Sequence, residues 1–328
     1  MKLLLFYIAV LILTLTSCEK ILIPTEKDTP KEIFRALWSN YDLHYAGFVV
    51  KNIDWDSVYA VYESRITNDL TEDQLFDQLT GMLAALKDQH VWLQTDKEFY
   101  SYQKPRPIYY YNSGIINTYL QAAKTQKMFT YGMLENNIGY FHISTFAANE
   151  DGYYYIDNIL EEFKNCNGIV IDVRSNAGGS DLKAGLIACK FYDETRNYCY
   201  IQNRNGADHS DFSERSYRSL SPAANARPDI PVVLLTDQSV GSAGEDFTLM
   251  LRILPQVKVV GDYTGANPGG VPRPMELQNG WIYYVPTGLQ YTMEDELFIH
   301  TGMKPDILAT DQQSGKDMMI EKAIDNLK

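Results

Sequence analysis

The hydrophobic pattern divides the chain into an N-terminal helical part and a later part in which strands and helices alternate. Between residues 30 and 93, apolar side chains recur three or four positions apart, which is typical of amphipathic helices. We predict three helices whose apolar positions fall within residues 33–41, 54–66 and 75–86. The third helix starts with Thr71-Glu-Asp-Gln74, a capping-box pattern.

Residues 97–134 have a different character, because they are rich in Tyr and contain Pro105 and Pro107. Apolar and polar residues alternate in short runs such as 115–120, and we predict short strands there. The aromatic cluster at residues 109–111 has two interpretations. It either lines a substrate groove or covers a sheet face.

From Ile138 onward, strand patterns and helix patterns alternate, which indicates an α/β domain. A buried strand is a short, continuous apolar run rich in β-branched residues. We predict strands at residues 139–146, 168–173 and 231–236, and helices at 153–165, 181–189 and 245–254.

The turn between the strand at 231–236 and the helix at 245–254 carries Ser242. A serine at such a junction exposes its hydroxyl beside backbone N–H groups that have no helical partner. Nucleophilic catalysis of acyl transfer needs this combination. The alternative is that Ser242 only caps the helix, a common role for Ser.

Two further turns contain residues that are candidates for a functional role. His90 follows the third helix and is either a general base or a structural surface residue. Gly178-Gly179 follows the strand at 168–173, where glycines let N–H groups face an anion or simply make a tight turn. A phosphate loop would require a following Lys-Ser/Thr, which is absent from the sequence.

The charge balance narrows the class of partner. The chain of 328 residues has 42 acidic and 29 basic residues, a formal net charge of −13. This excess of negative charge argues against nucleic acid or an anionic membrane surface as the partner.

The N-terminus predicts export. Lys2 precedes an apolar run at residues 3–15 that is too short to span a bilayer comfortably, which is typical of a signal peptide. The run ends in Leu15-Thr-Ser-Cys18, which resembles a bacterial lipobox with Cys18 as the lipidated residue. We therefore expect a lipoprotein signal peptide at 1–18 and a tether at 19–29.

Three other cysteines remain: Cys166, Cys189 and Cys199. One disulfide, such as Cys189–Cys199, is compatible with export, but the spacing does not establish it. No cysteine pair has metal-ligand spacing with a His, so we predict no metal site and no cofactor.

Three motifs together resemble the tail-specific, or C-terminal-processing, serine peptidase family, in its tricorn-like branch. They are Asp172-Val-Arg-Ser-Asn-Ala-Gly-Gly179, Ser242-Ala-Gly-Glu245 and Gly302-Met-Lys-Pro-Asp306. The resemblance implies an α+β or α/β fold, with a small N-terminal helical domain and a crotonase/ClpP-like β-β-α catalytic core. It also implies domains at 30–95 (helical), 96–136 (a Tyr-rich β segment without a complete PDZ domain) and 137–328 (catalytic).

The same resemblance implies roles for individual residues. Ser242 stands at the nucleophile position, His90 at the general base, and the N–H groups of Gly179 and Ala243 at the oxyanion hole. The classical Lys, 25 residues beyond the Ser, is replaced by Asn267.

The third catalytic group is open. The tricorn-like branch places a Glu where this chain has Ile299, and Glu294 or Glu296 are the candidates to replace it.

The resemblance implies a peptidase that acts on exported protein or peptide substrates. It would be held in the bacterial cell envelope by its lipid anchor, at the outer membrane and facing the periplasm or the surface. The alternative is a catalytically inactive protein on the same scaffold that binds a peptide or a lipophilic ligand.

Overall fold

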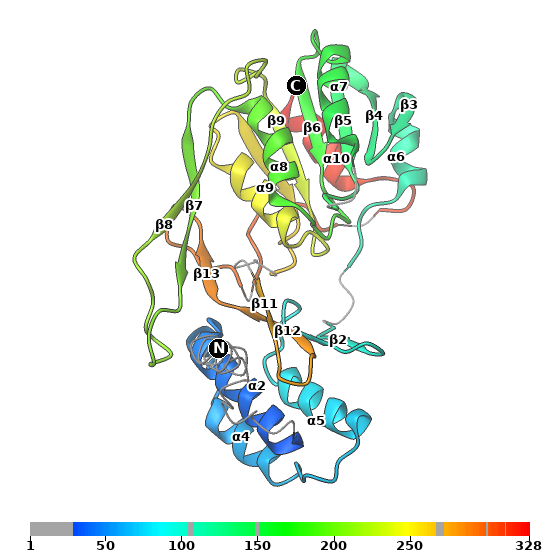
Figure 1. Cartoon of the computed structure of the whole chain (residues 1–328). Helices are drawn as coiled ribbons and strands as arrows, with labels where there is room; N and C mark the ends of the chain where they lie inside the picture. Colours follow the sequence, from blue (N-terminus) through cyan, green and yellow to red (C-terminus); the bar gives the residue numbers. More distant parts are fainter. Residues whose placement is uncertain (1–28, 104–107, 148–150, 267–271, 300, 312) are drawn as a thin grey trace, which may run out of the picture.

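The computed structural model describes residues 29–328, except 104–107, 148–150, 267–271, 300 and 312. The predicted signal peptide, Cys18 and nearly all of the predicted tether lie outside the described residues. Within the described part, the chain forms a small N-terminal helical part and a larger sheet-containing part (Figure 1). Along these residues, no helix combines the length and apolar character that crossing a membrane requires.

The three predicted N-terminal helices are present, with one short helix between the first and second. They are α2 (Pro30–His44), α3 (Phe48–Lys51), α4 (Trp55–Glu63) and α5 (Glu72–Ala84). Thr71 caps α5 through the predicted capping box with Gln74, and Asp54 caps α4 by accepting from the Ser57 N–H. Local polar residues therefore fix where these helices begin.

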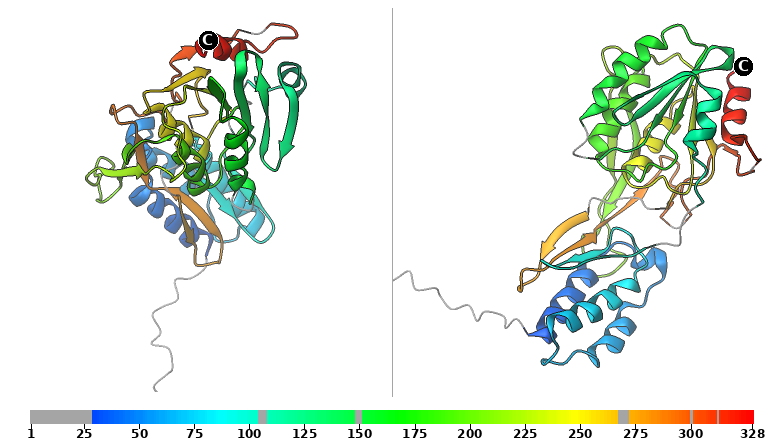
Figure 2. Two further views of the ribbon diagram at one scale, coloured as in Figure 1. Left: turned by 90° about the horizontal axis from the view of Figure 1, so that it is seen from above. Right: turned by 90° about the vertical axis from the view of Figure 1, so that its right-hand side faces the viewer.

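A four-stranded antiparallel sheet lies on the helices and joins segments that are far apart in the sequence (Figures 1 and 2). Its order is β11 (Pro272–Glu276), β12 (Ile282–Pro286), β1 (Trp92–Gln94) and β2 (Phe99–Ser101). Leu93, Tyr283 and Val285 point to one side and join the helical core. The sheet thus ties the N-terminal helices to a late hairpin, which the sequence pattern did not predict.

The larger part is built on a seven-stranded sheet with the order β14-β10-β9-β6-β5-β4-β3. Its strands are β3 (Gln121–Gln126), β4 (Phe129–Leu134), β5 (Ile138–Ile143), β6 (Gly168–Asp172), β9 (Val232–Thr236), β10 (Val257–Gly261) and β14 (Ile307–Leu308). The run from β5 to β14 is parallel, and β3, β4 and β5 are antiparallel. Strands β5, β6 and β9 are buried throughout, which explains their continuous apolar sequences.

Helices cover both faces of this sheet. On one face lie α7 (Ile156–Glu162), α8 (Asp181–Ala188) and α9 (Ala243–Arg252); on the other lie α6 (Ser113–Tyr119) and α10 (Met318–Asn326). Short 3-10 turns at Glu135–Asn137, Gly152–Tyr155 and Cys189–Phe191 complete the connections. The fold class predicted from the sequence, a helical N-terminal part followed by a mixed α/β core, is confirmed.

One predicted element is wrong. Residues 115–120 were expected to form a strand, but 115–119 belong to helix α6 (Ser113–Tyr119) and Leu120 is its C-cap. The Asn112 side chain accepts hydrogen bonds from the N–H groups of Gly114 and Ile115, and Ile116 packs into the core. A run of seven residues is too short for periodicity to separate helix from strand, and the Asn cap decided the outcome.

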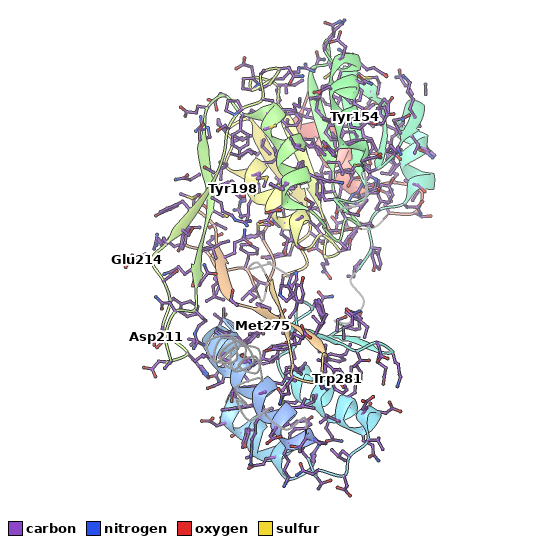
Figure 3. The ribbon with its side chains drawn as sticks, viewed as in Figure 1. Tyr154, Tyr198, Asp211, Glu214, Met275 and Trp281 are labelled. Atoms are coloured by element: carbon purple, nitrogen blue, oxygen red, sulfur yellow. The ribbon has the colours of Figure 1, made fainter. Side chains whose placement is uncertain are left out.

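A three-stranded sheet extends from the large part toward the N-terminal helices, and consists of β7 (Arg196–Asn203), β8 (Ser216–Leu220) and β13 (Gly288–Tyr291). We call the β7–β8 hairpin the arm; Figure 3 labels Asp211 and Glu214 near its tip. Arg204 donates to the Tyr45 carbonyl at 3.2 Å, and the His209 ring stacks on Phe48 with centroids 4.2 Å apart. The arm therefore forms a second connection between the two parts.

Candidate active site

Ser242 lies at the turn between β9 and α9, as predicted from the sequence. It occupies the N-cap position, but its side chain makes no capping hydrogen bond. Its backbone has φ 51° and ψ −124°, a conformation that non-glycine residues rarely adopt and that is concentrated at functional sites. Within the described residues, the Ser242 hydroxyl makes no hydrogen bond, so capping does not explain why this residue is a serine.

The Gly178-Gly179 turn lies directly against Ser242. A Cβ atom on Gly178 would lie 2.8 Å from the Ser242 Cβ and 2.9 Å from the Ala243 nitrogen. A Cβ on Gly179 would lie 2.2 Å from the Phe146 carbonyl, and φ there is +138°. Only glycines allow this close approach of three backbone segments.

Two N–H groups at this junction are available to a ligand. Two backbone hydrogen bonds join Phe146 to the residues on either side of Gly179. The Phe146 N–H donates to the Gly178 carbonyl at 3.0 Å, and the Ser180 N–H donates to the Phe146 carbonyl at 2.7 Å. By contrast, the N–H groups of Gly179 and Ala243 donate to no residue that the structure describes. Ala243 is the first residue of α9, where N–H groups have no helical partner, and free donors of this kind are what an oxyanion hole requires.

Asn176 joins the two turns, a role that the sequence analysis did not assign. Its side chain donates to the Ile143 carbonyl at 3.0 Å and accepts from the Gly178 N–H at 2.9 Å. Its carbonyl accepts from the Gly241 N–H at 3.2 Å. Because Asn176 is fully buried, these bonds hold the Gly-Gly turn and the Ser242 turn in register. Its place in the motif was the only signal for this role.

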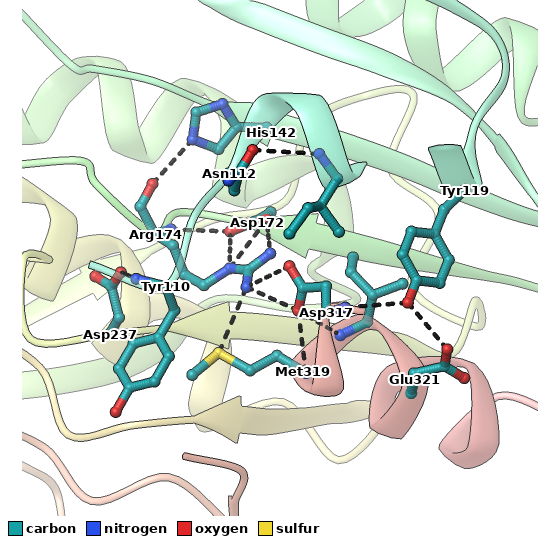
Figure 4. A network of polar contacts seen from close by, with 12 residues as sticks. Tyr110, Asn112, Tyr119, His142, Asp172, Arg174, Asp237, Asp317, Met319 and Glu321 are labelled. Carbon is teal, nitrogen blue, oxygen red and sulfur yellow. Dashed lines mark hydrogen bonds and ion pairs between the residues drawn. The ribbon is translucent and has the colours of Figure 1, made fainter. Parts of the chain in front are cut away.

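A buried ion network supports the start of the same turn (Figure 4). The Arg174 guanidinium lies 2.6 Å from Asp172 and 2.8 Å from Asp317. The Tyr140 hydroxyl also donates to Asp172, at 2.8 Å. Burial alone would raise the pKa of Asp172, but the Arg174 charge lowers it below its usual value. The network fixes the end of β6, from which the Gly-Gly turn leaves.

His90 follows α5 in the turn before β1 and is half-buried. Its backbone N–H donates to the Asp88 carboxylate at 3.0 Å. Asp88 also accepts from Lys51 at 2.9 Å and from the Tyr45 hydroxyl at 2.8 Å. Burial opposes ionisation of Asp88, but the Lys51 charge prevails and lowers its pKa.

In this structure His90 and Ser242 are not hydrogen-bonded, because the Ser242 hydroxyl has no partner among the described residues. His90 belongs to the N-terminal part and Ser242 to the large part (Figure 1). Catalytic hydrogen bonds are often long in the absence of substrate and tighten when substrate binds. The general-base role of His90 therefore stays a prediction.

The candidates for a third catalytic group lie on the surface. Glu294 and Glu296 are both exposed. Their backbone N–H groups each donate to the Thr292 hydroxyl at 3.2 Å. The Glu296 carboxylate is 4.0 Å from Arg252. The third group of the site thus stays open.

Two acidic residues on the first turn of α9 are buried, which the sequence analysis did not predict. Glu245 accepts a hydrogen bond from the Thr264 hydroxyl at 2.5 Å, and that hydroxyl accepts from the Met303 N–H at 2.8 Å. This contact fastens the motif that begins at Gly302 to the nucleophile helix. Asp246 accepts from Gln290 at 2.7 Å, and burial raises its pKa to about 6.

The structure shows the state of the three cysteines and whether side chains of the described residues could form a metal site. Cys166, Cys189 and Cys199 are all free, so the possible Cys189–Cys199 disulfide is not formed. The Cys199 sulfur instead lies 3.4 Å from the Gln290 side-chain nitrogen. No group of three His, Cys, Asp or Glu side chains in the described part of the chain could hold a metal ion.

Comparison with known proteins identifies the family. The profile of Peptidase family S41 matches residues 137–309, and that of the Tricorn protease C1 domain matches residues 27–84. Carboxy-terminal processing protease CtpA of Bacillus subtilis is 25% identical over 179 residues, which are 54% of this chain and 36% of that protein. Tricorn protease of Thermoplasma acidophilum is 22% identical over 295 residues, 88% of this chain and 24% of that protein.

Solved structures agree with this assignment. A candidate peptidase from Parabacteroides merdae superposes with a TM-score of 0.82 at 32% identity, covering 92% of this chain and 97% of that one. The photosystem II D1 C-terminal processing protease has a TM-score of 0.59 at 15% identity, covering 85% of this chain and 92% of that one, and shares the fold. The chain spans only about a third of the length of curated relatives such as CtpA. It belongs to Peptidase family S41.

Proposed function

We propose that the protein is a serine peptidase that hydrolyses peptide bonds with Ser242 as the nucleophile. The observation that carries this proposal is the geometry of the Ser242 turn. An uncapped hydroxyl lies on a turn that packs against Gly178, and the N–H groups of Gly179 and Ala243 at this junction have no acceptor within the described residues. An acyl-transfer transition state places its oxyanion beside such a nucleophile, where these donors would stabilise it.

In the proposed mechanism, His90 takes the proton of the Ser242 hydroxyl as its oxygen attacks the substrate carbonyl carbon. The resulting oxyanion accepts from the N–H groups of Gly179 and Ala243. His90 then gives the proton to the leaving amine, and water hydrolyses the acyl-enzyme with His90 again as the base.

We also propose that the substrates are exported proteins or peptides. The sequence of residues 1–18 favours a lipid anchor on Cys18, and the resemblance to the tail-specific peptidase family favours the outer membrane of a bacterial cell envelope as its location. Several relatives bear the name of carboxy-terminal processing proteases, which is consistent with protein substrates.

The test is labelling of the purified protein with a fluorophosphonate, which reacts only with an activated serine. We expect labelling of the wild type, and loss of labelling in Ser242→Ala and His90→Ala. Ser216→Ala is the matched control, because Ser216 is exposed on β8 outside the site. Labelling that persists in Ser242→Ala would refute the nucleophile assignment.

The second candidate is a catalytically inactive protein that binds a peptide or a lipophilic ligand. The absence of a hydrogen bond to the Ser242 hydroxyl favours it, as do Asn267 and Ile299 at positions where relatives carry a Lys or a Glu. Wild-type protein that is folded by circular dichroism and yet unlabelled would favour this candidate.

A further inference from the structure

We propose that the free face of the β11-β12-β1-β2 sheet binds apolar and aromatic side chains of an extended peptide. This inference rests on the proposed peptidase function and names the surface that would hold the substrate. We call this surface the aromatic face; its members are Trp92, Phe99, Pro274, Ile282 and Tyr284.

Strand alternation puts these side chains on one side of the sheet. Leu93 faces the helical core, so its neighbour Trp92 points to the opposite side. Trp92 is paired across the ladder with Tyr284, and their rings stack with centroids 4.0 Å apart. The Phe99 ring lies 5.5 Å from Trp92.

The aromatic face is uncovered within the described chain. Phe99 is 61% exposed and Ile282 is 40% exposed, and they sit on either side of Gln94. Pro274, opposite Tyr284, is exposed as well. Several large apolar side chains gathered on one surface mark an interaction site, whereas single exposed ones do not.

The aromatic face lies next to the turn that carries His90 and is connected along the chain to the helix that follows Ser242. Trp92 follows His90 by two residues. On the other side, β12 continues into β13, where Gln290 donates to Asp246 on the first turn of α9. The six residues from Tyr284 to Gln290 span about 20 Å of extended chain. An extended peptide of similar length therefore reaches from the aromatic face to the Ser242 turn.

The two edges of the sheet differ in what they offer to a peptide backbone. β11 carries Pro272 and Pro274, which lack an N–H and cannot donate to a further strand. β2 is the other edge and contains no proline. An extended peptide can pair with β2 and lay alternate side chains on the aromatic face.

The negative charge on the aromatic face affects which peptides can bind there. Glu276 lies opposite Ile282 in the ladder and is exposed. An acidic peptide would be repelled there, and the same carboxylate disfavours an anionic lipid surface. The occupant is therefore a neutral or basic segment with apolar side chains, such as an unfolded part of a protein.

The test measures binding in the Ser242→Ala background, so that no peptide is consumed. Three fluorescently labelled ten-residue peptides are compared: one with Phe and Leu alternating with Ser, one with Ala in place of Phe and Leu, and one with Glu in place of Ser. We expect only the first to bind well. Adding Phe99→Ala should weaken its binding about twofold to tenfold, the range for loss of one aromatic contact.

Val61→Ala is the matched control, since Val61 is an apolar side chain on α4 that is 48% exposed and outside the aromatic face. Ile282→Ala provides a second variant in case one of them disturbs folding. Unchanged peptide affinity in both Phe99→Ala and Ile282→Ala would overturn the proposal. Fluorophosphonate labelling of the wild type tests the proposed function separately, because the probe is too small to need the aromatic face.

Discussion

The carboxylate of Asp88 accepts a hydrogen bond from the backbone N–H of His90, with the nitrogen and oxygen 3.0 Å apart. The same carboxylate is paired with Lys51, whose side chain is only 9% exposed and also donates to the Leu86 carbonyl at 3.0 Å. A buried ion pair therefore fixes the turn that carries His90. The position of the proposed base depends on Asp88 although Asp88 does not touch a substrate.

Asp88→Asn should lower the free energy of unfolding by about 3 kcal/mol, because it leaves the Lys51 charge buried without a counter-charge. Urea unfolding measures this loss. The double variant Asp88→Asn/Lys51→Met removes both charges and should recover part of the stability. If the single variant is as stable as the wild type, the pair does not hold the His90 turn.

Gly179→Ala should reduce peptidase activity by about 10² to 10³-fold, the usual effect of losing one oxyanion donor. The added Cβ would lie 2.2 Å from the Phe146 carbonyl, so the turn must move away from Phe146 and displace the Gly179 N–H. Gly280→Ala is the control: φ there is also positive, at +83°, but nothing lies within 4 Å of the added Cβ. Wild-type turnover in Gly179→Ala would remove Gly179 from the oxyanion hole.

Asp246 should make stability depend on pH in a defined direction. Burial raises its pKa in the folded state to about 6 from 3.8, so the folded protein binds the proton more tightly than the unfolded chain. Its contribution is therefore most favourable below about pH 4 and is lost as the pH rises through 6, by about 3 kcal/mol in total. Asp246→Asn cannot ionise and keeps an acceptor for Gln290.

Urea unfolding of the wild type and Asp246→Asn at several pH values between 4 and 7 isolates this effect. The variant should gain stability relative to the wild type as the pH increases. A difference that stays constant over this range would contradict the raised pKa.

Arg174→Met should destabilise the large part by about 3–5 kcal/mol, because Asp172 and Asp317 would remain buried without their counter-charge. Lys164→Met is the control, since Lys164 pairs with Glu161 at the surface, where both side chains are more than half exposed. That surface pair should contribute less than about 1 kcal/mol. Thermal unfolding compares the two variants, and equal losses would contradict the structural role of Arg174.

Elements that depend on local signals could be predicted from the sequence. The N-terminal helices were predictable because apolar spacing and capping residues such as Thr71 act within a few positions. The buried strands β6 and β9 were predictable as continuous apolar runs. The turns that follow them were predictable because they contain glycine or serine. Ser242 and Gly179 could be selected as candidates on this basis and on the motifs they belong to.

Contacts between segments that are far apart in the sequence could be seen only in the folded structure. β1 has three residues, too few for a periodic pattern, and it pairs with β12 about 190 residues later. Helix α6 formed where strands were expected, because Ile116 packs against the sheet and Asn112 caps the helix.

The same division holds for the candidate site. The sequence indicated that the Gly178-Gly179 turn and Ser242 follow two strands. It did not indicate that Gly178 contacts Ser242, which happens because β6 and β9 are parallel neighbours in the sheet. The pairings of Asp88 with Lys51 and of Asp246 with Gln290 had no sequence signal. Each depends on burial of a charge next to a partner from another element, and burial is a property of the packed chain rather than of any local segment.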